Sequence, residues 1–329
     1  MVSPPLNPLF LAGPTAVGKS DVALCLAAWL GGEIISVDSM QVYRGLDLGT
    51  AKPSAADRRR IPHHLIDVVE LDDAFDAARF VCLARQAAQE IRSRGHVPIF
   101  CGGTGLYFKA YLEGLGDTPR SDPAVRAELE ATPLATLLRE LEAGDPAAFR
   151  QIDRQNPRRV IRALEVIRLT GKPFSAQRAP WSRDLAPLDP QTPIWLFGLE
   201  RDAADLHARI EARVDAMFRR GLVEETRRLL DLGLGRNPTA MQAIGYRQVV
   251  EHLRGERPLA ETIALVKVRT RQFAKRQMTW FRKQLAVTWD RWLAREPLEA
   301  VARRLADRYR AGHTGRAGLD CARGGRSLG

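Results

Sequence analysis

A short apolar stretch runs directly into a glycine-rich loop near the N-terminus, and this combination constrains the fold more than any other feature. Residues 8–12 read Pro-Leu-Phe-Leu-Ala, and residues 13–20 fit the pattern Gly-x-x-x-x-Gly-Lys-Ser. An apolar helical pattern follows over residues 22–30. In a loop of this form, backbone N–H groups and the start of the helix face an anion. The segment therefore predicts a phosphate-binding loop at the edge of a parallel sheet.

The residues of this loop share a predicted role in binding phosphate or diphosphate. They are Gly13, Pro14, Thr15, Ala16, Val17, Gly18, Lys19 and Ser20. Lys19 adds a point charge, and the hydroxyl of Ser20 can hold Mg²⁺. An ordinary glycine-rich turn is the alternative, but the flanking strand and helix supply the context that a phosphate-binding loop requires.

The acid that usually accompanies such a loop is missing from its expected strand. Walker-type nucleotidases hold their metal with an acid after a later apolar strand, whereas residues 97–101 run into Gly-Gly-Thr-Gly at 102–105. The acid follows the second apolar stretch instead, as Asp38. Ligands of open α/β sheets bind at the carboxyl ends of strands. Asp38 is thus predicted beside the phosphate loop, where it accepts a proton or hydrogen bond from a second substrate or supports the metal through water.

Six sequence blocks resemble the tRNA dimethylallyltransferases, also called tRNA isopentenylpyrophosphate transferases, of the bacterial type. They occur in order at residues 13–20, 37–43, 49–53, 62–67, 102–107 and 275–280. A lone phosphate loop is a weak indicator of function, whereas six ordered blocks are specific. The resemblance implies transfer of a dimethylallyl group from dimethylallyl diphosphate to N6 of the adenosine at tRNA position 37, next to the anticodon. The products would be N6-(dimethylallyl)adenosine and diphosphate.

Composition agrees with a polyanionic partner. The 329 residues carry a formal net charge of +11, and basic surfaces gain affinity by releasing counterions from phosphates. An arginine-rich composition or a solvated surface is the alternative explanation. No apolar stretch approaches the ~18 residues that cross a bilayer. We expect a monomer in the cytoplasm, with the tRNA anticodon stem-loop and dimethylallyl diphosphate as partners and no membrane.

The predicted fold class is α/β, with a P-loop NTPase-like parallel sheet flanked by helices and an inserted all-helical subdomain. Strand and helix patterns alternate over residues 9–115, as a parallel sheet with covering helices requires. We assign residues 1–117 and 191–311 to the catalytic core with tRNA-contacting C-terminal helices, and 118–190 to a helical subdomain that binds tRNA. Glycine, arginine and serine dominate residues 312–329, which predicts a disordered basic tail.

Basic and aromatic patterns, together with the resemblance, assign many residues to tRNA binding. Arg158 and Arg162 share a helical face, although a solvated face is the alternative. Trp280 and Phe281 are predicted to stack on an unpaired base, with a core role as the alternative. The full set is Asp38, Ser39, Met40, Gln41, Thr104, Arg126, Arg158, Arg159, Val160, Ile161, Arg162, Gln242, Ala243, Ile244, Gly245, Tyr246, Arg247, Lys275, Arg276, Gln277, Met278, Thr279, Trp280, Phe281 and Arg282.

The chemistry requires one group for the leaving diphosphate and another for the adenine amine. The predicted catalytic residues are Lys19, Asp38 and Thr104. Asp38 is the general base, although a capping role or metal support through water is the alternative. The resemblance places Thr104 where the two substrates meet and adds Arg213 as a diphosphate contact. The spacing leaves other arginines open as that contact, namely Arg209, Arg219 and Arg220.

Mg²⁺ is the only cofactor that we expect, held by Ser20 and through water by Asp38. His63 and His64 lack a third ligand at metal-binding spacing, so we interpret them as structural. Two other functions use similar features. A small-molecule kinase would use the same loop with ATP, and a nucleotide switch that binds RNA would not require Asp38. The missing acid after residue 101 argues against ordinary ATP hydrolysis.

Overall fold

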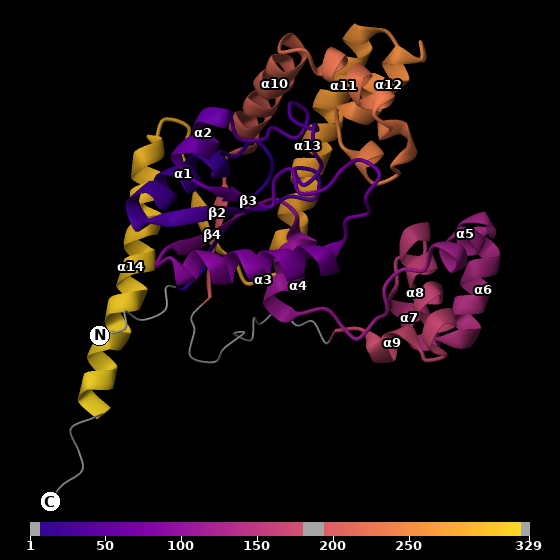
Figure 1. The fold of residues 1–329 in the computed structure, drawn as a ribbon, viewed down its shortest axis with the longest axis horizontal. Helices are drawn as coiled ribbons and strands as arrows, with labels where there is room; N and C mark the ends of the chain where they lie inside the picture. Colours follow the sequence, from indigo (N-terminus) through magenta and orange to yellow (C-terminus); the bar gives the residue numbers. More distant parts are fainter. Residues whose placement is uncertain (1–6, 180–193, 324–329) are drawn as a thin grey trace, which may run out of the picture. The chain divides into compact units, whose positions relative to one another are not determined.

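The computed structural model describes residues 7–179 and 194–323, which form two compact units. One unit draws on Met1–Leu112 and Arg183–Gly329, and the other is Glu113–Ser182. In Figure 1, helices surround a sheet in the first unit, and the second consists of helices. The inserted subdomain predicted at 118–190 corresponds to this second unit with different bounds, and residues 180–190 lie outside the described part of the chain.

The larger unit is built on a parallel sheet with the strand order β3-β2-β4-β1-β5-β6. Its strands are β1 Leu9–Ala12, β2 Gly32–Val37, β3 His63–His64, β4 Val97–Gly102, β5 Trp195–Glu200 and β6 Thr288–Arg291. β1 pairs with β4 and β5, in a register that places Leu9 beside Ile99 and Trp195. Strands that are buried on both faces need continuous apolar residues, which β1 and β4 supply, whereas β2 also buries Glu33 and Ser36. The predicted α/β fold class is confirmed.

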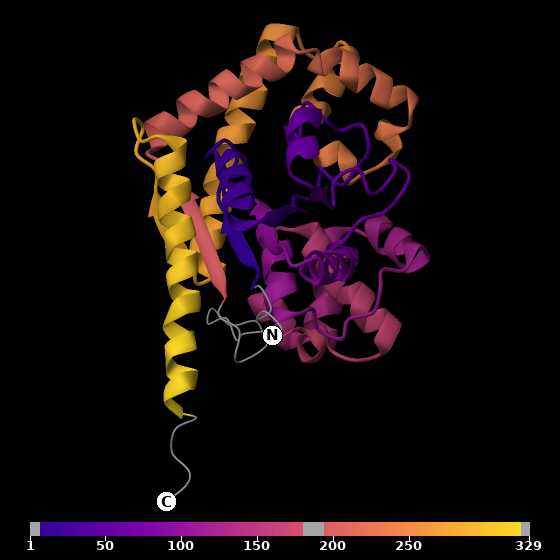
Figure 2. The same cartoon turned by 60° about the vertical axis from the view of Figure 1, so that its left-hand side comes forward.

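Helices cover both faces of this sheet. α3 (Ala77–Ser93) and α4 (Gly105–Glu113) pack in one apolar core, where the Phe10 and Phe100 rings stack 4.7 Å apart. α1 (Lys19–Leu30) and α14 (Leu298–Arg323) contact each other and build the second core (Figures 1 and 2). The remaining helices of this unit are α2 Ala55–Arg60, α10 Ala203–Arg219, α11 Leu222–Asp231, α12 Tyr246–Leu253 and α13 Leu259–Gln284, with short 3₁₀ turns at Leu234–Arg236 and Ala240–Gln242.

The smaller unit packs its helices around an apolar core and encloses two buried carboxylates, Asp145 and Glu165. They are α5 Pro123–Ala131, α6 Leu134–Gly144, α7 Pro146–Gln151, α8 Pro157–Thr170 and α9 Phe174–Gln177. Glu165 on α8 is fully buried; it accepts hydrogen bonds from the Ser121 hydroxyl and the Asp122 N–H and pairs with Arg162 at 2.7 Å. Val160 and Leu164 lie in the apolar core of the unit. α8 therefore turns its apolar residues inward and leaves Arg158 and Arg159 exposed.

α14 corrects the prediction of a disordered tail. The helix continues through residues 312–323, which the sequence assigns to the tail, and residues 324–329 lie outside the described part of the chain. Arginine, alanine and leucine are good helix formers, and they alternate with the glycines of this stretch. Among the described residues, no helix is both long enough and apolar enough to cross a membrane.

A buried carboxylate on β2 organises the sheet edge next to β3. Glu33 is 3% exposed and contacts the Arg94 guanidinium at 2.8 Å, His64 Nε2 at 2.7 Å and His96 Nδ1 at 2.7 Å. His63 Nδ1 lies 2.7 Å from the Ile61 carbonyl oxygen. These contacts support the structural interpretation of both histidines. No group of residues that could hold a metal through histidine, cysteine or carboxylate side chains occurs in the described part of the chain.

Acid is expected to destabilise the protein through Glu33. Burial raises the pKa of this carboxyl, but its hydrogen bonds with Arg94, His64 and His96 outweigh burial and lower it to about 2. The unfolded chain, with an ordinary glutamate pKa, binds the proton more readily, so this stabilisation is present above roughly pH 4.3 and is lost as the pH falls towards 2. Urea unfolding of Glu33→Gln should show lower stability at pH 7 and a smaller loss on acidification. An unchanged acid dependence would contradict this role.

Candidate active site

The phosphate-binding loop joins β1 to α1 and is held in a conformation that needs glycine at residue 18. Gly18 has a φ of 102°, and a Cβ atom there would lie 2.5 Å from the Trp292 ring. The Lys19 ammonium folds back over the loop and donates to the Pro14 carbonyl oxygen at 3.2 Å. Burial lowers the Lys19 pKa, which the Arg213 charge lowers further and the Asp38 charge raises. Lys19, Arg213 and Asp38 thus lie close enough to influence one charge.

Two arginines hold the loop from outside through its carbonyl groups. Arg201 Nε donates to the Val17 carbonyl at 2.8 Å, and Arg209 Nε donates to the Ala16 carbonyl at 2.9 Å. The Arg201 guanidinium also stacks on the Trp292 ring, 3.7 Å from its centroid. Neither Arg201 nor Trp292 was among the site residues predicted from the sequence. The available signal was that Arg201 directly follows the apolar stretch of β5, at the sheet edge where ligands bind.

Arg213 is the arginine that remains available for an anion. In the part of the chain that the structure describes, Arg213 makes no hydrogen bond or ion pair, although burial lowers its pKa. Arg209 is engaged with the loop backbone, and Arg219 and Arg220 are exposed. A half-buried guanidinium without a partner carries an uncompensated desolvation cost. This geometry favours Arg213 among the alternatives that spacing leaves open.

Asp38 and Thr104 meet at the carboxyl ends of β2 and β4. Asp38 Oδ1 accepts hydrogen bonds from the N–H groups of Met40 at 2.8 Å and Gln41 at 3.2 Å. Ser39 N–H donates to Thr104 Oγ1 at 3.1 Å, so the two loops are joined. Within the described residues, Asp38 Oδ2 has no hydrogen-bond partner. One carboxylate oxygen therefore caps the turn, and the other is free to accept a proton.

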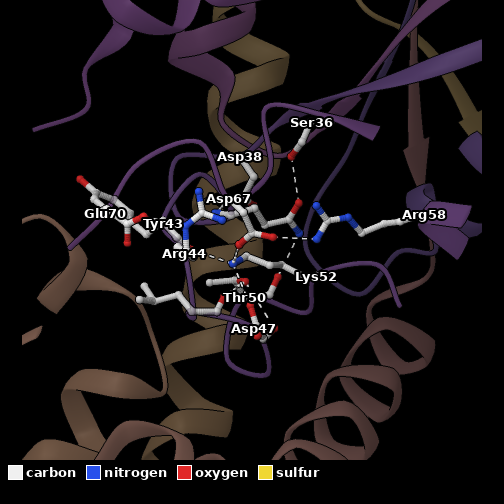
Figure 3. A network of polar contacts seen from close by, with 12 residues as sticks. Ser36, Asp38, Tyr43, Arg44, Asp47, Thr50, Lys52, Arg58, Asp67 and Glu70 are labelled. Atoms are coloured by element: carbon white, nitrogen blue, oxygen red, sulfur yellow. Dashed lines mark hydrogen bonds and ion pairs between the residues drawn. The ribbon is translucent and has the colours of Figure 1, made fainter. Parts of the chain in front are cut away.

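The loop between β2 and α2, residues 38–54, is held in place by a network of hydrogen bonds and ion pairs (Figure 3). Lys52 Nζ donates to the Tyr43 carbonyl at 2.7 Å and contacts Asp47 at 2.8 Å and Asp67 at 2.5 Å. Gln41 Nε2 donates to the Thr50 carbonyl at 3.1 Å. The loop borders a cavity of about 690 Å³ with a polycationic and partly apolar lining, formed by Arg44, Gly45, Asp47, Leu48, Ala51, Lys52, Pro53, Ser54, Ala55, Arg58, Asp67, Arg213, Ala216, Met217 and Arg220.

Comparison with known proteins identifies the family. A family model described as IPP transferase matches residues 41–284, which is more than half of the chain. The chain belongs to the IPP transferase family. It is 47% identical over 292 residues to a tRNA dimethylallyltransferase of Desulforudis audaxviator, covering 88% of this chain and 92% of the relative. It is 48% identical over 282 residues to one of Halorhodospira halophila, covering 84% and 90%. The resemblance seen in the sequence is confirmed.

Solved structures give the same result. The full-length tRNA isopentenylpyrophosphate transferase of Bacillus halodurans superposes with a TM-score of 0.69 at 38% identity, over 95% of this chain and 99% of the other. A eukaryotic dimethylallyltransferase acting on tRNA gives a TM-score of 0.70 at 27% identity, over 86% and 74%. As a member of the family, the chain is a transferase enzyme.

The residues predicted to contact tRNA divide by exposure. Half-exposed side chains include those of Arg126 and Arg162, which pair with Glu165 at 3.9 and 2.7 Å. On α13, a cavity of about 540 Å³ is lined by Gln272, Lys275, Arg276, Thr279, Trp280, Lys283 and Gln284. The exposed members of the predicted set are Arg158, Arg159, Gln242, Arg247, Lys275, Arg276, Thr279 and Arg282.

Several other members of the predicted set are buried. These residues are Val160, Ile161, Ala243, Gly245, Tyr246, Gln277 and Phe281. Phe281 packs edge-on against Phe108 in the core, with ring centroids 5.9 Å apart, so it does not stack on a base. Apolar and aromatic side chains in these blocks gain more from leaving water than from facing RNA. These side chains therefore support the fold in this structure, and contact between their segments and RNA stays a prediction.

Tyr246 packs against the loop around Gly49 and hydrogen-bonds to it. Its hydroxyl accepts the Gly49 N–H at 3.0 Å and donates to Glu225 at 2.5 Å, while Glu225 accepts the Leu48 N–H at 3.0 Å. A Cβ atom on residue 49 would lie 2.4 Å from the Tyr246 ring. The block at 242–247 therefore positions a loop of the cavity wall through its tyrosine.

Tyr246→Phe is expected to lower the free energy of unfolding by about 1–3 kcal/mol, because the buried Glu225 and the Gly49 N–H each lose a partner. Urea denaturation followed by circular dichroism measures the loss. Tyr309→Phe removes another tyrosine hydroxyl, which donates to the Asn7 carbonyl near the chain end. The larger loss should come from Tyr246→Phe, and equal losses would argue against a network at Glu225.

Proposed function

We propose that this chain transfers the dimethylallyl group of dimethylallyl diphosphate to N6 of the adenosine at tRNA position 37. The C–O bond to diphosphate breaks, a C–N bond to N6 forms, and the N6 proton leaves to a base. The single observation that carries the proposal is the free oxygen of Asp38 at the same sheet edge as the phosphate loop and the unpartnered Arg213. The names of the relatives, tRNA dimethylallyltransferases, support it.

The leaving diphosphate needs donors that are in place before its charge develops. Lys19 and the N-terminus of α1 supply them on one side, and Arg213 supplies a guanidinium. Arg201 and Arg209 donate to the carbonyls of residues 17 and 16, and we assign them to keeping the loop in shape. Charge stabilisation is thus divided between groups that bind the anion and groups that hold the loop.

The N6 amine of adenine needs a proton acceptor. That acceptor must not be an oxygen already used to hold the turn that carries it. Asp38 Oδ1 is occupied by two backbone N–H groups, so Oδ2 takes the N6 proton. Thr104 lies beside the same turn through its bond with Ser39 N–H. We place the Thr104 hydroxyl where it orients the amine or the diphosphate, in keeping with its position between the two loops.

Mg²⁺ is a proposed cofactor. Mg²⁺ is usually held by one or two protein oxygens together with substrate phosphates and water. The Ser20 hydroxyl is exposed in the first turn of α1, directly after Lys19, and this single oxygen fits that ligand pattern. We propose that Ser20 holds the ion and that Asp38 supports it through water. When bound, it would neutralise charge on the diphosphate. We further propose that the enzyme acts as a monomer in the cytoplasm, where unmodified tRNA is available.

The proposal is tested by transfer of radiolabelled dimethylallyl diphosphate to unmodified tRNA in the presence of Mg²⁺. A matched tRNA with guanosine at position 37 is the control. Label in the adenosine tRNA alone is the expected result. Absence of transfer, with release of phosphate from ATP, would overturn the proposal in favour of a kinase or nucleotidase.

Arg213→Gln is expected to weaken binding of diphosphate and to slow transfer by about 10²-fold, the lower end of the range for loss of one charge-stabilising donor. Arg219→Gln, which removes equal charge from an exposed position of the same helix outside the cavity lining, should change transfer less than threefold. Single-turnover rates and calorimetric titration with diphosphate measure both effects. A larger loss in this control, or in Arg220→Gln, which removes a charge from the same cavity, would move the contact away from Arg213.

A further inference from the structure

Gln277 joins two loops of the candidate active site through one amide group. It lies on α13 and is 8% exposed. Its Oε1 accepts the Thr15 N–H of the phosphate-binding loop at 2.8 Å, and its Nε2 donates to the Gly103 carbonyl at 2.9 Å. Only a side-chain amide offers an acceptor and a donor in this arrangement, whereas an ionised carboxylate accepts at both oxygens. The two loops are thus held at a spacing that one side chain sets.

The side chains of α13 pack so closely around this amide that residues 103 and 105 have no space for a Cβ atom. A Cβ atom on residue 103 would lie 2.2 Å from Gln277 Nε2 and 3.4 Å from the Gly13 carbonyl oxygen. A Cβ atom on residue 105 would lie 2.1 Å from the Trp280 ring. Gln277 and Trp280 are three residues apart and therefore neighbours on one side of α13. Gln277 and Trp280 thus contact Gly103 and Gly105, the residues on either side of Thr104. A shift of the helix is therefore expected to move this segment.

An adjoining face of the same helical turns carries positive charge that no ion pair neutralises. Lys275, Arg276 and Lys283 are exposed around the cavity of about 540 Å³, and they form no ion pair with any other described residue. Earlier on α13, in contrast, Lys267 pairs with Asp215 at 2.7 Å and Arg271 pairs with Glu211 at 2.6 Å. Unpaired cations along a helix suit the phosphates of a nucleic acid. The turns of α13 that contact the active-site loops through Gln277 and Trp280 therefore also present cations to which RNA could bind.

We infer that Gln277 is a positioning residue that makes binding of RNA on α13 and binding of diphosphate in the phosphate loop cooperative. The inference rests on the proposed function, because it takes the RNA and the diphosphate as the two ligands. RNA that fixes α13 fixes Gln277, which in turn holds the Thr15 amide and the segment that carries Thr104. By linkage, diphosphate must then strengthen RNA binding by the same factor. In this proposal Gln277 does not contact tRNA directly; it links α13 to the loops at Thr15 and Gly103.

The test measures cooperativity without any reaction. Inorganic diphosphate with Mg²⁺ is titrated calorimetrically into the protein, alone and with a saturating anticodon stem-loop RNA that carries the target adenosine. The wild-type chain should bind diphosphate about tenfold more tightly with RNA, within the usual range of coupling between sites. Gln277→Met keeps the length of the side chain and removes both hydrogen bonds, so the factor should fall below about twofold.

A matched control lies on the same helix. Thr262 is fully buried, and its hydroxyl donates to the Pro258 carbonyl at 3.1 Å, so Thr262→Val removes a buried hydrogen bond of α13 that touches neither loop. Thr262→Val should keep the wild-type factor. If Gln277→Met does not fold, as judged by circular dichroism, Gln277→Glu replaces it; this variant keeps an acceptor for Thr15 and should lose the coupling when ionised.

Two results would overturn the inference, namely independent binding of RNA and diphosphate to the wild-type chain or an unchanged factor in the Gln277 variants. A failure of the proposed function is distinguishable from both. In that case the stem-loop would not bind the wild-type protein at all, or would bind without transfer of label from dimethylallyl diphosphate.

Discussion

Replacing Asp38 with asparagine is expected to slow dimethylallyl transfer by about 10²–10⁴-fold, the usual contribution of a general base, while both substrates still bind. The structure makes this substitution unusually specific. Oδ1 of Asp38 accepts the N–H groups of Met40 and Gln41, and the carbonyl oxygen of asparagine can accept both. The turn therefore survives, and the variant loses the basic oxygen that takes the N6 proton.

Single-turnover rates with enzyme in excess over tRNA separate the transfer step from binding. Affinities for stem-loop RNA and for diphosphate, measured separately, should change less than threefold. Asp72→Asn is the matched control, because Asp72 is exposed and lies outside the candidate site. Transfer at the normal rate by an Asp38→Asn enzyme that binds both substrates would remove Asp38 as the base.

The core of the fold could be predicted from sequence because its signals are local. A strand, the loop at residues 13–20 and a helix follow each other within one short segment. Asp38 and Thr104 each follow an apolar strand, and the carboxyl ends of parallel strands meet at one edge of a sheet. Their proximity, joined through the Ser39 N–H, was therefore within reach of sequence reasoning.

The roles of Tyr246 and Gln277 were not within reach. Tyr246 binds Gly49 across 197 residues, and Gln277 binds Gly103 across 174 residues. A basic and aromatic block has the same local appearance whether it faces RNA or supports a loop. Which side chains of α13 turn inward depends on where the two loops lie in space, and no local pattern encodes that. The same holds for Arg201 and Trp292, which contact the phosphate loop although Arg201 follows Val17 by 184 residues and Trp292 lies later still in the chain.

These long-range contacts explain why the blocks at 242–247 and 275–280 accompany the phosphate loop in one chain. Tyr246 holds the loop at Gly49, and Gln277 holds the loops at Thr15 and Gly103. The same blocks also carry exposed cations, namely Arg247, Lys275 and Arg276. Each block thus combines an inner residue that shapes the active site with outer residues that suit RNA.

Replacing Lys19 with methionine is expected to reduce transfer by about 10²–10³-fold, the loss that accompanies removal of one preorganised donor for developing negative charge. Methionine keeps an unbranched stem within the loop but cannot donate to the Pro14 carbonyl or to the diphosphate. Affinity for diphosphate should also fall when no RNA is present. In this respect Lys19→Met should differ from Asp38→Asn, which leaves diphosphate binding intact.

Two comparisons decide whether the loss belongs to Lys19 itself. Arg303→Met removes one positive charge from an exposed position on α14 and should leave the rate within threefold of wild type, which excludes an effect of net charge on RNA binding. Circular dichroism and thermal melting of Lys19→Met test whether the loop change unfolds the core. A folded Lys19→Met enzyme that binds diphosphate and transfers the allyl group at the wild-type rate would contradict the assignment of the leaving group to this loop. The anion would then have to be held by Arg213 and its neighbours in the adjoining cavity. Comparing the loss of transfer rate in the Lys19 and Arg213 variants distinguishes the two arrangements, because the larger loss marks the residue that holds the diphosphate.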